Sequence, residues 1–224
     1  MHLCKSDEGL KTDSLAIGMA VYLRIGDKPT TALLMNIAYF IDQTFDKIDF
    51  AQQPLGKGEY ENCTFTNGNF STADVSEFVF SDCEFKGCNF SLAKLSKTAF
   101  RNIKFFDCKL TGLQFHTCND FLFSVRFEKC ILNLSSFYKL KIKKTHFKNS
   151  SLHEVDFEGS DLSGSIFEHC DLSRAIFEAS NIEKCDFRTA FNYAIDPERN
   201  KIKGAMFSLH GIMGLLEKYD IVVG

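Results

Sequence analysis

The side chains best suited to chemistry in this chain are its nine cysteines, six histidines and many carboxylates. No CxxC pair occurs, and no cysteine and histidine stand at the interval of a structural zinc site. The histidines are scattered, and the chain has no phosphate-binding glycine loop and no GxSxG or HExxH motif. We therefore expect no catalytic residues, no metal site, no cofactor and no enzymatic activity.

Composition narrows the class of protein further. The 224 residues carry a formal net charge of −3, with 45% hydrophobic and 25% charged residues. These values exclude a disordered chain, a strongly basic nucleic-acid binder and a membrane-embedded protein. The apolar run from Leu15 to Leu23 is followed at once by Arg24, so it is too short to span a bilayer and makes a poor signal peptide. We expect a cytoplasmic protein with reduced thiols.

A five-residue repeat governs the middle of the chain, and it explains why 24 residues are phenylalanine. From Tyr60 to Phe115 every fifth residue is large and apolar; the register then slips by two residues and resumes from Leu122 to Phe187. The position two residues earlier is usually small, and the other three are mostly polar. Neither a helix nor a simple strand has this period.

A four-sided coil accounts for this period. If each pentapeptide forms one side and one corner, the large and the small residue point inward, and a coil closes after about twenty residues. Residues twenty apart then stack, as Phe127, Phe147, Phe167 and Phe187 would on one side, and Leu122, Ile142, Leu162 and Ile182 on another.

Seven cysteines occupy the small inward position, where a compact thiol packs well: Cys63, Cys83, Cys88, Cys108, Cys130, Cys170 and Cys185. Cys63 and Cys83 are twenty residues apart, as are Cys88 and Cys108, so each pair stacks on neighbouring coils about 4.8 Å apart. That spacing would permit a disulfide, and packing as free thiols is the alternative that a reducing compartment favours.

Stretches such as Cys170-Asp171-Leu172-Ser173-Arg174 resemble the pentapeptide-repeat family, whose consensus is a small residue, Asp or Asn, Leu or Phe, and two variable polar residues. The resemblance covers about 130 residues, or 26 pentapeptides. It implies an all-β fold, a right-handed quadrilateral β-helix. Members linked to fluoroquinolone resistance are dimeric rods that bind DNA gyrase and topoisomerase IV by imitating DNA.

The chain divides into four parts. Residues 1–34 form an N-terminal extension that is either disordered or not native, residues 35–59 an irregular first coil and cap, and residues 60–191 the β-helix. The slip at 116–121 is either a tolerated insertion or a contact loop. Residues 192–224 form a loop and a short helical C-terminal cap, which either closes the tube or pairs two chains. The apolar residues of this cap or dimer contact are Leu209, Ile212, Leu215, Leu216 and Tyr219.

Charge is segregated along the sequence. A basic belt with a net charge of +6 between Phe121 and Ser150 precedes an acidic band with a net charge of −7 between Ser151 and Phe187. The belt comprises Arg126, Lys129, Lys139, Lys141, Lys143, Lys144 and Lys148. The band comprises Glu154, Asp156, Glu158, Asp161, Glu168, Asp171, Glu178, Glu183 and Asp186.

Three functions fit these charges. The most specific is DNA mimicry by the acidic band, which would bind DNA gyrase or topoisomerase IV; the basic belt interrupts the negative charge that this requires. The second is a general protein-interaction scaffold in which the charged bands select and orient the partner. Weak nucleic-acid binding by the belt is the third and least favoured, because only Tyr138 supplies an outward aromatic ring.

Overall fold

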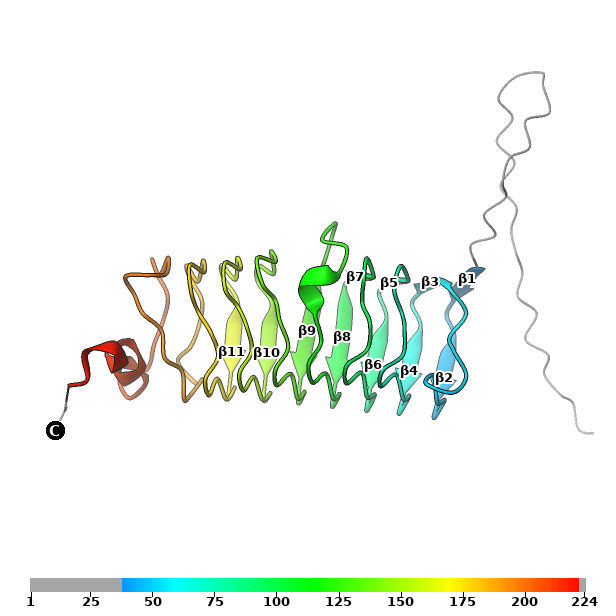
Figure 1. The fold of residues 1–224 in the computed structure, drawn as a ribbon, viewed down its shortest axis with the longest axis horizontal. Coiled ribbons are helices and arrows are strands. Elements are labelled where there is room, and N and C mark those ends of the chain that lie inside the picture. The colour runs from blue at the N-terminus through cyan, green and yellow to red at the C-terminus, as the bar shows by residue number, and fades with distance from the viewer. Residues whose placement is uncertain (1–37, 222–224) are drawn as a thin grey trace, which may run out of the picture.

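The computed structural model describes residues 38–221, which wind into a straight rod with the C-terminal segment at one end (Figure 1). Its regular elements are short: β1 (Ala38–Ile41), β2 (Thr44–Asp46), β3 (Gly58–Glu61), β4 (Thr64–Thr66), β5 (Val79–Ser81), β6 (Glu84–Lys86), β7 (Ala99–Arg101), β8 (Ile103–Phe106), β9 (Val125–Glu128), β10 (His146–Lys148) and β11 (Ile166–Glu168), with three 3₁₀ helices, η1 (Phe115–Thr117), η2 (Gly211–Leu215) and η3 (Glu217–Tyr219).

All strand pairs are parallel, in a four-stranded sheet of order β1-β3-β5-β7 and a seven-stranded sheet of order β11-β10-β9-β8-β6-β4-β2. Paired residues are twenty apart, as in Phe65 beside Phe85 and Phe147 beside Phe167, except between β8 and β9, where they are twenty-two apart. The predicted four-sided β-helix with about twenty residues per coil is confirmed.

Each coil of the chain forms four outer faces in the same order, and we number the faces in the order in which they follow along the chain. Face 1 holds the four-stranded sheet and continues through Lys141, Asp161, Asn181 and Lys201; face 2 holds the seven-stranded sheet. Isolated bridges run along face 3 from Asp49 through Asn69 to Phe191, and along face 4 from Asp74 to Lys94 and from Gln114 through Ser136 and Asp156 to Ile176. Residues adjacent in sequence are therefore spread over several faces, and residues twenty apart are neighbours.

Stacked aromatic rings fill the tube. The ring of Phe147 lies parallel to those of Phe127 and Phe167, with centroid distances of 5.3 and 4.9 Å. Each ring also meets a ring of the adjacent side edge-on, as Phe147 meets Phe157 at 6.0 Å. Both arrangements are favoured by the ring quadrupole, so the ladders add stability beyond the apolar area that they bury.

The small inward positions hold free thiols and hydroxyls. All eight cysteines of the described residues are buried and free. The Sγ of Cys83 donates to the Tyr60 carbonyl at 3.3 Å, and the Oγ1 of Thr98 donates to the Val75 carbonyl at 2.8 Å. Several side chains at this position therefore bond to the backbone of the preceding coil, whereas the buried hydroxyls of Ser135 and Ser160 have no hydrogen-bond partner within residues 38–221.

The corners require a left-handed backbone. From Lys139 (φ +55°) to Lys184 (φ +58°) every fifth residue has positive φ, including Gly159 and Gly164. Left-handed backbone is costly for residues with a Cβ. The packing of the tube offsets this cost, because the left-handed turn lets both the small and the large residue of the next side point inward.

The register slip lies later than the sequence indicated. Asn119 still pairs with Ala99, twenty residues away, whereas Val125 pairs with Ile103, twenty-two away. The two extra residues therefore fall within 120–124, which overlaps the predicted 116–121 at residues 120 and 121 and extends beyond it. The prediction that Leu122 points inward is wrong: its φ is +60° and its side chain is 63% exposed, and Phe123 fills the core position instead.

The predicted single helix near the C-terminus is two 3₁₀ turns, η2 and η3. The Oγ of Ser208, just before η2, accepts a hydrogen bond from the backbone N–H of Gly211 at 3.0 Å. A Cβ at Gly211 or Gly214 would overlap Tyr193, so these glycines let the segment lie against the last coil. Of the five predicted cap residues, Leu215 packs against the core and Leu216 is half-buried, while Leu209, Ile212 and Tyr219 face outward.

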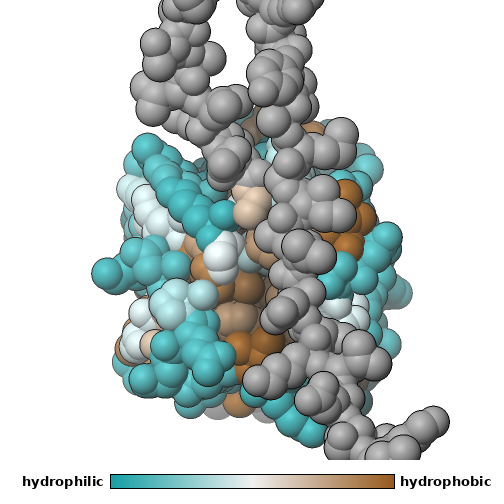
Figure 2. Space-filling view, turned by 90° about the vertical axis from the view of Figure 1, so that its right-hand side faces the viewer, coloured by the Kyte–Doolittle hydropathy of each residue, from teal (hydrophilic) through white to brown (hydrophobic). Residues whose placement is uncertain are grey.

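The other end of the rod begins with a coil that has no neighbour before it among the described residues. Phe40 and Phe45 stack on Tyr60 and Phe65 at 4.5 and 4.7 Å, and both are half-buried. Figure 2 shows apolar side chains in the middle of this end, surrounded by hydrophilic ones. The predicted extension, residues 1–34, lies outside the described residues. Within 38–221, no helix has the length and apolar character needed to cross a bilayer.

Candidate interaction surfaces

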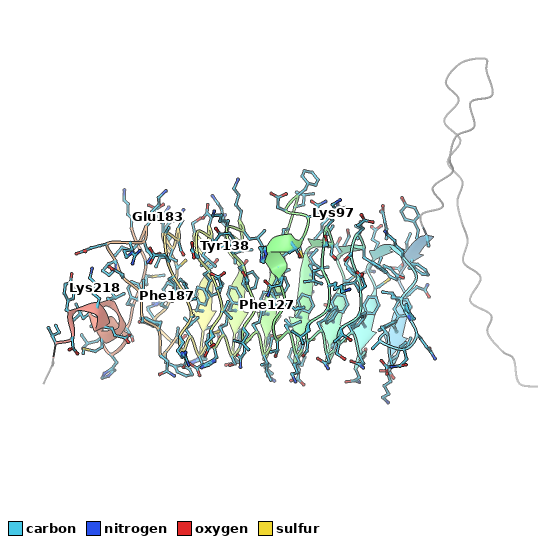
Figure 3. All side chains as sticks on the ribbon, in the orientation of Figure 1. Lys97, Phe127, Tyr138, Glu183, Phe187 and Lys218 are labelled. Atoms are coloured by element: carbon cyan, nitrogen blue, oxygen red, sulfur yellow. The ribbon has the colours of Figure 1, made fainter. Side chains whose placement is uncertain are left out.

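The available chemistry lies on the outside of the tube. In Figure 3 the rings of Phe127 and Phe187 lie within the coils, whereas Glu183 and Lys97 lie at the upper edge. Burial raises the pKa of Cys83, Cys170 and Cys185 to about 12, so these thiols are protonated and poor nucleophiles at neutral pH. Residues 38–221 contain no cluster of three or more metal-ligating side chains.

Ion pairs between coils neutralise part of the predicted acidic band. Five of its nine carboxylates bind a cationic group, usually about twenty residues away along the chain. These pairs are Glu154 with Arg174 at 3.0 Å, Asp161 with Lys143 at 3.0 Å, Glu168 with Lys148 at 3.4 Å, Glu178 with Arg199 at 2.6 Å and Asp186 with Arg188 at 2.7 Å. The other four are Asp156, Glu158, Asp171 and Glu183, and Asp171 accepts hydrogen bonds from Ser173 and Asn192.

Face 4 carries carboxylates in successive coils. Asp156 and Glu158 are followed one coil later by Glu178, and the next coil adds Asp196 and Glu198, which sequence reasoning missed. We call these five residues the acidic surface. The spacing of twenty from Glu158 through Glu178 to Glu198 could have identified this column. Hydrogen bonds from Lys218 to Asp196 and Glu198 hold the pKa of both carboxyls below its usual range.

The basic belt is divided among faces. Arg126 and Lys148 lie on face 2, Lys141 and Lys143 on face 1, and Lys129, Lys139 and Lys144 at left-handed corners. The structure brings three further lysines, Lys184, Lys201 and Lys203, onto face 1 in the next coils. The lysine surface comprises Lys141, Lys143, Lys144, Lys184, Lys201 and Lys203, all exposed. Because its two halves are forty to sixty residues apart, no window of sequence contains it.

A shallow hollow of about 430 Å³ lies on face 2. Phe106, one of the residues that line it, is 39% exposed, and the Lys129 ammonium lies 5.0 Å from the centre of the Phe106 ring. Glu84 also lines the hollow. Hydrogen bonds from Lys104 and Lys86 lower the pKa of its carboxyl group to about 2. Arg126, which also lines it, makes no ion pair within residues 38–221. Phe106 was missed because the sequence pattern assigned its position to polar residues.

The loop at the register slip carries two large apolar side chains. Phe121 is 65% exposed beside the outward Leu122, and the loop projects from the rod above η1 (Figure 1). Exposed pairs of this kind favour a contact with another molecule. The C-terminal segment offers a second apolar region, with Leu209 84% exposed and Ile212, Met213 and Tyr219 also outward.

Comparisons with known proteins agree with this geometry. A model of "pentapeptide repeats (8 copies)" matches residues 83–119, and a model of "pentapeptide repeat region" matches residues 120–191. Residues 83–191 belong to the pentapeptide-repeat family. The predicted resemblance is thus confirmed, and the pentapeptide-repeat register extends on both sides of the matched residues, from β1 to Met206.

Two solved structures share this pentapeptide-repeat fold. Both are trypsin-treated variants of QnrB1, a plasmid-mediated fluoroquinolone resistance protein. The first is 21% identical, with a TM-score of 0.55, and the match covers 83% of this chain and 99% of that chain. The second is 20% identical, with the same TM-score, and covers 83% and 97%. At these identities the likeness establishes the fold alone. No curated protein sequence matches the chain.

Proposed function

We propose that this pentapeptide-repeat chain is a non-enzymatic, cytoplasmic protein-binding solenoid, and that its acidic surface mimics DNA toward DNA gyrase or topoisomerase IV. Protein binding is supported by the filled interior of the tube, because only the outer side chains are then available for recognition. DNA mimicry is supported by the density of carboxylates on face 4.

The density of negative charge on the acidic surface is close to that of one DNA strand. Asp156 and Asp196 are two coils apart, which is about 9.6 Å. Five carboxylates lie in this interval, and Arg199 and Lys218 reduce their net charge to −3. One DNA strand carries one phosphate per 3.4 Å, or about three over the same length. An enzyme groove that binds a DNA backbone would therefore meet similar charge here.

The experiment is a gyrase supercoiling assay, with and without a quinolone, titrated with the purified protein. We expect inhibition or quinolone protection at micromolar concentration, lost in the triple variant Asp156→Lys, Glu158→Lys, Glu178→Lys. The control triple variant Glu59→Lys, Glu61→Lys, Asp107→Lys changes the net charge equally on other parts of the rod and should retain the effect.

Two results would oppose DNA mimicry. One is no effect of the native protein on gyrase or topoisomerase IV; the other is an equal loss in both triple variants. The general scaffold remains the alternative in either case, and its partner would be sought by pull-down. The general scaffold is supported by the exposed apolar pair Phe121 and Leu122, because DNA mimicry by charge does not account for exposed apolar side chains.

A further inference from the structure

The lysine surface carries an excess of positive charge. Between Lys141 and Lys203, face 1 and its corner carry six lysines against two carboxylates, Asp161 and Glu183, a net charge of +4. Only Lys143 is in an ion pair, with Asp161 at 3.0 Å. The other five lysines make no ion pair within residues 38–221.

The lysines are arranged in columns along the rod. The bridges Lys141 to Asp161, Asp161 to Asn181 and Asn181 to Lys201 place the first and last lysine three coils apart, about 14 Å. At the corner, Lys144 lies over Gly164, and Lys184 lies over Gly204. Both glycines have positive φ, as the corner requires, and both lysine side chains are exposed.

The other side chains of this surface narrow the choice of ligand. Between the lysines lie the carboxylates Asp161 and Glu183, together with Asn181, Ser163 and the two corner glycines. This surface has no exposed aromatic or large aliphatic side chain. Protein interfaces are held by buried aromatic and arginine anchors, and single-stranded nucleic acid is held by stacking on aromatic rings. Neither feature is present on this surface. Flexible point charges alone suit the phosphate backbone of a duplex, where binding is driven by counterion release.

We propose that the lysine surface binds the phosphate backbone of double-stranded DNA without sequence preference. The acidic surface lies on the adjacent face 4, so the rod offers a DNA-like face beside a DNA-binding face. A rod of this kind could contact an enzyme and the DNA that the enzyme holds. The two proposals depend on different residues and different ligands, and each can fail alone.

The experiment measures fluorescence anisotropy of a labelled 25-base-pair duplex titrated with the full chain at 25 to 150 mM NaCl. Binding of four to five phosphates predicts a slope of about −4 in a plot of log K against log salt concentration. We expect two unrelated duplex sequences to bind equally. The variant with Lys141, Lys144, Lys184, Lys201 and Lys203 changed to Gln should bind at least tenfold more weakly and with a shallower slope.

The matched control changes Lys47, Lys94, Lys97, Lys109 and Lys129 to Gln, which alters the net charge by the same amount. We expect it to keep at least a third of the native affinity, and both variants to keep the native circular dichroism spectrum. The proposal is overturned if the native chain does not bind at 25 mM NaCl, or if both variants lose affinity equally. It is also overturned if single-stranded DNA or polyglutamate binds more tightly than the duplex.

Discussion

Many buried phenylalanines stabilise the fold by ring stacking with phenylalanines of the coils before and after them. Phe147 is fully buried, and its ring lies between two parallel rings and against two edges. Truncation to alanine removes most of a ring that fills the tube, and the hydrogen-bonded backbone ladder cannot move inward to close the cavity. At this scale, stability and function are separate, because the ladder residues do not reach the surface.

We expect Phe147→Ala to lower the free energy of unfolding by about 3 to 5 kcal/mol. The measurement is urea unfolding followed by circular dichroism. Ile166→Ala, at an outward position of the next coil, is the control and should cost less than about 1 kcal/mol. Similar losses in the two variants would contradict the ladder as the main source of stability.

The register-slip loop, residues 119–124, is the element that can be changed with the least effect on folding. The strands before and after it in the chain, β8 and β9, are both paired with neighbouring coils, so the two extra residues do not disturb the ladder. Leu122 adopts a left-handed backbone with its side chain outward, which gives no folding benefit. A contact with a partner is therefore the interpretation that accounts for the apolar tip.

Replacing residues 119–124 with the four residues Asn-Leu-Ser-Asn would restore a regular coil. We expect the free energy of unfolding to stay within about 1 kcal/mol or to rise, because a strained loop is removed. We expect the effect on gyrase to weaken at least tenfold, measured in the same supercoiling assay. A fully active, stable variant would identify the loop as a tolerated insertion.

At the scale of the whole molecule, the C-terminal end of the rod is where we expect two chains to meet. A β-helix leaves an open edge at each end, and such edges favour association. The C-terminal segment covers the last coil through Leu215 and the ion pairs of Lys218, and it presents Leu209 and Ile212 outward. This apolar exterior is what a two-fold contact between chains would bury.

We expect the native protein to be a homodimer in size-exclusion chromatography with light scattering, and the variant Leu209→Lys, Ile212→Lys to be a monomer. The control Leu92→Lys, Leu134→Lys changes two exposed leucines in the middle of the rod and should remain dimeric. A native monomer at 100 μM would show that the segment only closes the tube.

The sequence alone determined the four-sided coil, its length of twenty residues per turn and most of the inward residues. The reason is that each pentapeptide places one large and one small residue in the same inward positions. Its period of twenty could also have revealed the column through Glu158, Glu178 and Glu198. The tertiary structure was needed for the slip, where Phe123 and not Leu122 fills the core. It was also needed for the charged surfaces, because winding the chain places Lys144 near Lys184 and pairs Glu154 with Arg174. Electrostatic interactions depend on distance in space, and in a solenoid the nearest neighbours belong to the next coil.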